Sequence, residues 1–179
     1  ADSDGLDHRG RMAVTAAGAA ADLDGLGIIV ELATKNTAHP LMWWSNYHHT
    51  FGHNLFFGLA CAGATYFYAR RNIRAALLAL ASFHIHLLCD IVGARGPDGD
   101  SWPIPYFAPV SDAVQISWSG QWALNAWPNF LITRAAMTLT LYFAWKRGYS
   151  PVGLVSERAD AAFVQTIRNR VARFRSRSQ

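Results

Sequence analysis

Two residues of an apolar run have the spacing of a helical ligand pair. His86 and Asp90 are four residues apart, so a helix sets both side chains on one face. An aspartate in an apolar helix is costly unless it is paired or bound to a cation. A hydrogen-bonded His–Asp pair without metal satisfies the same pattern. The spacing therefore predicts either a buried ion pair or part of a metal site.

A second cluster, His48, His49 and His53, lies where the preceding apolar segment begins. His49 and His53 are four residues apart, and His48 joins them if it stands just before the helix. Two apolar segments, roughly 48–69 and 73–92, flank an arginine-rich turn and should form antiparallel helices. The start of the first would then lie level with the end of the second. We therefore expect His53 to meet His86 and Asp90.

Two further elements could complete such a site. Asp22 and Asp24 are separated by one residue at the end of a short apolar segment, and His8 lies about fourteen residues upstream. The aspartates are candidate metal ligands, although Asp24 followed by a glycine could simply end a helix. His8 could equally be an exposed loop residue. His84 should point away from His86 and is interpreted as structural or lipid-facing.

The loop after Asp90 could cover the site. The segment 93–109 holds Arg95, which could bind a phosphate, and Trp102, which could contact a substrate. An ordinary packed loop is the alternative.

The composition predicts a compact all-α protein. It is 51% hydrophobic and 16% charged, whereas soluble domains are typically about 25% charged. We find no convincing strand pattern and no internal repeat. A bundle is expected, with about three long apolar helices, short N-terminal helices and a basic amphipathic C-terminal helix. The expected helices cover residues 11–21, 27–34, 48–69, 73–92, 112–118, 130–145 and 156–175.

The long apolar segments could cross a membrane. A span needs about 20 apolar residues, and the segments 51–68, 73–92 and 130–145 approach this length. Arginines and lysines follow the first and third segments, so a three-helix path puts them on one side. The positive-inside rule makes that side cytoplasmic, with the metal site toward the opposite face. A soluble all-α protein remains the alternative.

The basic tail carries the whole net charge. Residues 157–179 hold six arginines against two acids, so the remaining 156 residues balance at zero. We divide the chain into a helical metal-binding membrane domain, residues 1–155, and a basic tail, residues 156–179. The tail is expected to bind anionic membrane lipid. Nucleic acid is the weaker alternative, because the tail's aromatic residues Phe163 and Phe174 belong to its apolar face.

In order and spacing, these motifs resemble the YdjM-like metal-dependent hydrolases of bacterial inner membranes. The resemblance runs from about His8 to the tail. It rests on His8, Asp22-x-Asp24, His48-x4-His53, His86-x3-Asp90 and the Trp102-Pro103 loop. The chain departs from the family pattern at four places, where Ala21, His49, Gly52 and Asn54 replace Pro, Arg, Thr and Ser. These departures leave the ligand positions intact and alter their surroundings.

That family is similar to the α-helical, zinc-dependent phospholipase C proteins. The resemblance implies one or two zinc ions, with manganese or iron as other divalent candidates. It implies metal ligands from the set His8, Asp22, Asp24, His48, His53, His86 and Asp90. It also implies hydrolysis of a phosphoester or lipid-like substrate by a metal-activated water. Catalytic roles would fall to Asp22, Asp24 and Asp90, and substrate contacts to Arg95 and Trp102.

A non-catalytic interpretation stays open. A helical membrane subunit of a larger complex could use the same histidines and aspartates for a structural metal or a cofactor. An open coordination position would favour catalysis, and a closed shell of four protein ligands would favour a structural role.

Overall fold

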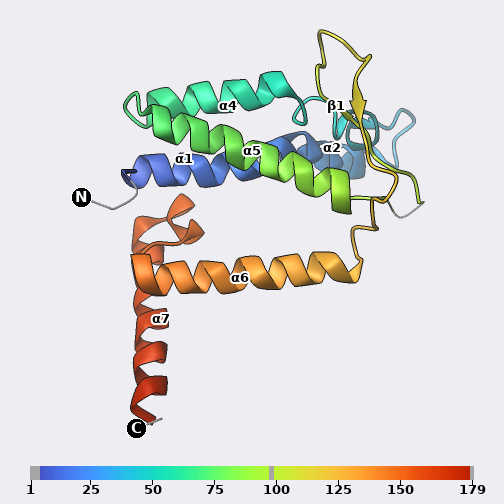
Figure 1. Ribbon diagram of the computed structural model, residues 1–179. Helices are drawn as coiled ribbons and strands as arrows, with labels where there is room; N and C mark the ends of the chain where they lie inside the picture. The colour runs from blue at the N-terminus through green and yellow to red at the C-terminus, as the bar shows by residue number, and fades with distance from the viewer. Residues whose placement is uncertain (1–4, 97–98, 178–179) are drawn as a thin grey trace. The chain divides into compact units, whose positions relative to one another are not determined.

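The computed structural model describes residues 5–96 and 99–177 and shows a mostly helical chain. The chain divides into two compact units, residues 1–124 and 125–179. The described residues form seven α-helices, two short 3-10 helices and one pair of two-residue strands (Figure 1). The predicted predominance of helix is confirmed. The predicted functional separation at residue 156 stays a prediction.

Three helices form the frame of the first unit: α1 (His8–Ala19), α4 (Leu55–Tyr68) and α5 (Ile73–Gly93) (Figure 1). Each begins at a side chain that caps its first turn, namely Asp7, Asn54 and Asn72. Helix α5 packs against both of the others and buries a stripe of apolar side chains. This stripe includes Ala75, Ala79, Phe83 and Leu87.

Helix α1 runs parallel to α5. Gly10 lies beside Ala75, and Gly18 lies beside Ser82. The chain after α1 therefore reaches the level of the second half of α5. There it forms the 3-10 helix η1 (Ala21–Leu26), followed by α2 (Gly27–Thr34) and α3 (Trp43–Tyr47). This path brings the segment that holds Asp22 and Asp24 to the carboxyl end of α5.

The loop after α5 contains the two strands, β1 (Ile104–Pro105) and β2 (Gln115–Ile116). They are antiparallel, with Ile104 opposite Ile116. Tyr106 joins the loop to the helices, because its carbonyl accepts from Leu55 N at 2.9 Å and its hydroxyl lies 2.8 Å from Nε2 of His84. The predicted helix at 112–118 is wrong. Ser111 Oγ accepts from Ala113 N, a local bond that favours a turn over a helix.

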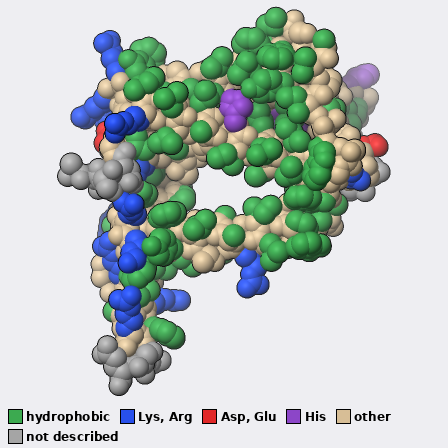
Figure 2. All heavy atoms as spheres, viewed as in Figure 1, with side chains coloured by type: hydrophobic (Ala, Val, Ile, Leu, Met, Phe, Trp, Pro, Cys, Tyr) green, Lys and Arg blue, Asp and Glu red, His purple; other side chains and the backbone are tan. Residues whose placement is uncertain are grey.

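The second unit consists of α6 (Trp127–Arg147), the 3-10 helix η2 (Pro151–Leu154) and α7 (Glu157–Arg177). Helix α6 ends at Gly148, whose φ of 79° is easily adopted by glycine. The buried carboxylate of Asp160 accepts from the backbone N and the hydroxyl of Ser150, which fixes the start of α7. Arginine side chains line much of α7 (Figure 2).

The prediction of about three long apolar helices is wrong. Within the described residues, α5 is the one unbroken helix long and apolar enough to span a membrane. Helix α1 and the η1–α2 segment are long and apolar enough to span a membrane only when they are taken together, as one span that is bent by 58°. Helix α4 has 14 residues, or about 21 Å, against a hydrocarbon core of about 30 Å. Helix α6 is long enough, but Asn129, Arg134 and its threonines make it too polar.

Candidate metal centre

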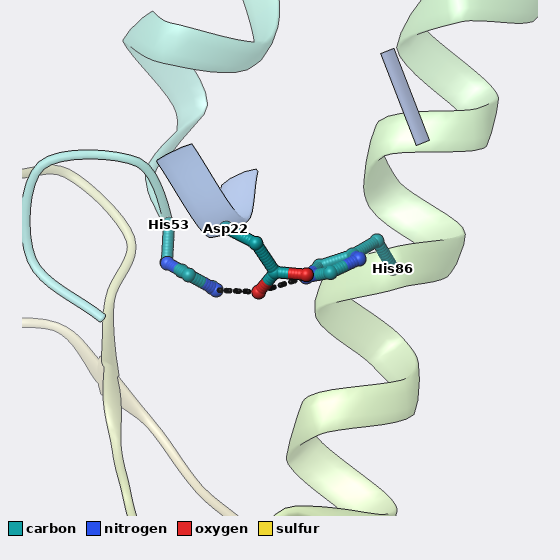
Figure 3. A group of neighbouring side chains, drawn as sticks. All are labelled: Asp22, His53 and His86. Carbon is teal, nitrogen blue, oxygen red and sulfur yellow. Dashed lines mark ion pairs between the residues drawn. The ribbon is translucent and has the colours of Figure 1, made fainter. Parts of the chain in front are cut away.

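Four side-chain atoms from three segments converge at the carboxyl end of α5. Nε2 of His86 lies 3.1 Å from Oδ2 of Asp90 and 3.4 Å from Oδ1 of Asp22. Nε2 of His53 lies 3.3 Å from Oδ2 of Asp90 and 3.9 Å from Oδ1 of Asp22. Asp22 from η1 reaches between His53, which precedes α4, and His86 of α5 (Figure 3).

A glycine allows the loop between α3 and α4, residues 48–54, to contact η1. We refer to this loop as the histidine loop. A Cβ atom at Gly52 would overlap the carbonyl oxygen of Ala21, so no other residue fits here without a shift of the backbone. The close approach lets the backbone N of Gly52 donate to Oδ2 of Asp24 at 2.9 Å. His53 follows directly and is fully buried.

Asp24 orients the rings of His48 and His53 by contacting their Nδ1 atoms. Its Oδ1 lies 3.0 Å from Nδ1 of His48, and its Oδ2 lies 3.1 Å from Nδ1 of His53. Both oxygens are therefore engaged, and the side chain is only 4% exposed. A carboxylate on one ring nitrogen of a histidine fixes the tautomer and leaves the other nitrogen for a metal. Asp24 has the position of this supporting carboxylate rather than that of a ligand.

The spacing of the four converging atoms fits a bound cation. Tetrahedral ligand atoms at 2.0–2.2 Å from zinc are about 3.3–3.6 Å apart, and three of the four separations given above, 3.1, 3.3 and 3.4 Å, are close to this range. Three of the atoms are buried: Nε2 of His53, Nε2 of His86 and Oδ2 of Asp90. Among the described residues, none of them has a partner with hydrogen-bond geometry. Buried polar atoms without such partners are rare, and a bound ion, ligand or water molecule would supply the partner.

The charges around the histidines also favour a cation. Burial lowers the pKa of His53, but the adjacent carboxylates of Asp24 and Asp90 outweigh it and raise the pKa to about 9. Burial lowers the pKa of His49 to about 4, helped by the nearby rings of His53 and His48. Without a metal, the cluster therefore holds a proton on His53 at neutral pH and keeps His49 neutral.

His49 is a candidate ligand that the resemblance did not point to. One atom each from His49, His53 and Asp90 lie within 4.8 Å of one another, and the His49 ring stacks on His53 at 4.2 Å. Asp22, His53 and His86 form a second group of the same kind. Because both groups include His53, they describe overlapping parts of one centre. The four-residue spacing of His49 and His53 was the available signal.

Besides Asp24, two predicted ligands lie outside the four-atom cluster. His8 begins α1, next to the amino end of α5, and α1 separates it from η1 by about 18 Å. His48 bonds to Asp24 and stacks on Trp44 with a ring separation of 5.3 Å. His48 therefore borders the centre, whereas His8 lies at the other end of the helical frame.

The two predicted substrate contacts are placed differently. The Trp102 ring lies 5.0 Å from that of His49 and 5.8 Å from that of His48. A cavity of about 390 Å³ opens there, with Trp44 and Trp102 among its walls. Arg95 instead donates from Nη2 to the carbonyl of Ser119 at 3.0 Å, which holds the following loop.

Gln121 connects the loop between α5 and α6, residues 94–126, to the metal centre, a role that sequence reasoning missed. We refer to this loop as the covering loop. It is 2% exposed, its Nε2 donates to the carbonyl of Asp90 at 2.7 Å, and its Oε1 accepts from Trp102 N at 3.3 Å. A single glutamine in a long irregular segment offers no spacing signal.

Comparison with known families agrees with the motif order. No curated protein and no solved structure gives a significant match. The likeness to zinc-dependent phospholipase C therefore stays a prediction. The family model described as the YdjM inner membrane protein matches residues 2–158, which is most of the chain. The chain belongs to the YdjM inner membrane protein family.

Proposed function

We propose that this chain is a membrane-bound, metal-dependent hydrolase. The observation that supports this most is the convergence of two imidazole nitrogens and two carboxylate oxygens, three of them buried without hydrogen-bond partners. Two imidazoles and the carboxylate of Asp90, with the fourth position left open, suit zinc best among common divalent ions, with manganese or iron as alternatives. The family assignment supports an inner-membrane location.

The residues divide into binding and reacting groups. His53, His86 and Asp90 would hold the cation, with Asp24 fixing the ring of His53. A cation bound there would lower the pKa of a water molecule toward neutrality. Asp22 is 59% exposed, so its carboxylate stands on the solvent side of the cluster. Its Oδ1 would accept a proton from water on that side, the role of a general base.

The substrate is proposed to be a phosphoester or a lipid-like ester. The cavity between Trp44 and Trp102 is lined by polar and aromatic groups and borders His48 and His49. It offers space for the polar part of such a substrate next to the centre.

Metal content tests the centre directly. The purified chain, loaded with zinc and dialysed, should hold zinc in stoichiometric amount, and His86→Ala should lose it. His84→Ala is the matched control, because His84 lies on the same helix but faces Leu80 O and Tyr106. The proposal fails if zinc is absent, or if both variants retain it equally.

Hydrolysis separates catalysis from a structural metal. At saturating zinc, the wild type should cleave at least one member of a panel of phosphomonoesters, phosphodiesters and carboxylic esters. Asp22→Asn should retain zinc under these conditions and lose at least 100-fold in rate, as expected for a lost general base. Zinc binding without any hydrolysis would instead support the structural alternative.

A further inference from the structure

A second cavity, of about 830 Å³, borders the metal centre. Its walls are mainly apolar and come from five segments: η1, α2, α3, the histidine loop and α4. The side chains that matter here are Leu26, Val30, Trp43, Tyr47, Phe51 and Phe57. Its volume lies in the range typical of small-molecule sites. We refer to this cavity as the apolar groove.

The apolar groove and the metal centre share residues. Asp24 lines the groove, and the same carboxylate holds the rings of His48 and His53. Gly52, which precedes His53, and Leu23, which follows Asp22, also line the groove. A molecule bound in the apolar groove would therefore lie next to the metal centre, because two residues that line the groove are sequence neighbours of Asp22 and His53.

The groove presents apolar surface that is costly in water. Leu26 is 56% exposed, Trp43 is 48% exposed and Phe51 is 61% exposed. Exposed apolar surface that continues along a groove indicates a binding site rather than ordinary surface. Among the described residues that line the apolar groove, Asp24 is the only charged one. Its oxygens already face two histidines and a backbone N–H, so it adds little free charge to the wall.

We propose that the apolar groove binds an acyl chain of a membrane lipid, whose anionic head lies at the metal centre. This inference rests on the proposed function and names its substrate class as an amphiphilic ester. Charge complementarity supports the orientation, because a cation held by His53, His86 and Asp90 would attract a phosphate, while the apolar groove would accept hydrocarbon. Membership of an inner-membrane family places such lipids within reach.

Alkyl phosphates of increasing length test this proposal. Butyl and octyl phosphate share the head and differ in the chain, so their ratio of dissociation constants isolates the chain site. The zinc-loaded full chain is held in amphipol rather than detergent, because detergent chains would compete for the groove. Dissociation constants are measured by calorimetry for the wild type and three variants.

The variants fill, empty or spare the apolar groove. Val30→Trp places a bulky ring in it, and Phe51→Ser removes an aromatic wall residue that is 61% exposed. Ile29→Trp is the matched control, because Ile29 is on the same helix, is 63% exposed and does not line the groove. Zinc content is measured for every protein, so loss of the metal centre is seen separately.

In the wild type and Ile29→Trp, octyl phosphate should bind at least tenfold more tightly than butyl phosphate. In Val30→Trp and Phe51→Ser this ratio should fall below threefold with zinc content unchanged. An equal ratio in all four proteins, or no dependence on chain length, overturns the proposal. Zinc removal should weaken both ligands by the same factor. If it weakens neither, the head does not lie at the centre and that part of the proposal is wrong.

Discussion

Asp22 and Asp24 are two residues apart in η1 and are placed for different tasks. Asp24 is 4% exposed and holds two histidine rings, whereas Asp22 is 59% exposed and faces His53 and His86 through their Nε2 atoms. The sequence predicts both as ligands and cannot separate them. Which of the two carboxylates contacts the Nδ1 atoms of the histidines depends on the turn of the 3-10 helix and on the close approach of Gly52.

We predict that Asp24→Asn weakens zinc binding about 10- to 100-fold while the chain stays folded. An amide can no longer favour the required tautomer of both rings, and losses of this size are typical for supporting carboxylates. A competitive titration against a coloured chelator measures the affinity. Asp100→Asn, at an exposed loop position, should bind zinc as the wild type does. Unchanged affinity in Asp24→Asn would contradict the supporting role.

We predict that Gly52→Ala destabilises the protein by about 1–3 kcal/mol, because the new methyl group overlaps backbone rather than a flexible side chain. Gly63→Ala on α4 meets no atom within 4 Å and should be neutral or stabilising by up to about 1 kcal/mol. Thermal unfolding in one detergent compares the two variants. Equal effects of both substitutions would show that the close approach at Gly52 is not required.

At the scale of elements, apolar length predicts α5 to within one residue, because the 20 residues 73–92 contain no glycine or proline. The start of α4 is predicted seven residues too early. The chain forms a loop there, since His49 has a φ of 68° and Asn54 caps the helix at Leu55. This loop matters because it sets the His49 ring on His53. Nothing in a single sequence shows a positive φ at a non-glycine residue.

The covering loop yields an element-scale prediction. Gln121→Leu should remove the bonds to Asp90 and Trp102 together, and so should speed hydrogen exchange at the Trp102 amide at least tenfold. The free energy of unfolding should fall by about 1–3 kcal/mol, since buried partners are left unpaired. Gln165→Leu, which removes an exposed bond to Asn169, is the control. If the Trp102 amide exchanges at the wild-type rate, Gln121 does not hold the loop.

At the scale of the molecule, the candidate ligands all belong to the first of two compact units. We predict that removing zinc with a chelator increases hydrogen exchange in residues 48–57 and 84–93. Exchange at the start of α7, where Asp160 holds Ser150, should stay unchanged. Mass spectrometry of peptic fragments resolves these segments. An equal rise in both units would contradict a metal that stabilises only the first.

The basic helix α7 is predicted to lie on anionic lipid, since each arginine near such a surface contributes about 1 kcal/mol. Hydrogen exchange in α7 should therefore slow when zwitterionic nanodiscs are replaced by anionic ones. The double variant Arg170→Glu, Arg173→Glu should lose this slowing. If lipid charge has no effect on the wild type, α7 does not bind the membrane surface.

The most direct test of the metal centre is zinc-edge X-ray absorption on the loaded full chain. The account predicts a shell of nitrogen and oxygen atoms only, at about 2.0–2.2 Å, with two imidazole rings visible in the outer scattering. His84→Ala should preserve this spectrum, and His86→Ala should lose one ring or the metal itself. A sulfur ligand near 2.3 Å, or an unchanged spectrum in His86→Ala, would contradict the centre described above.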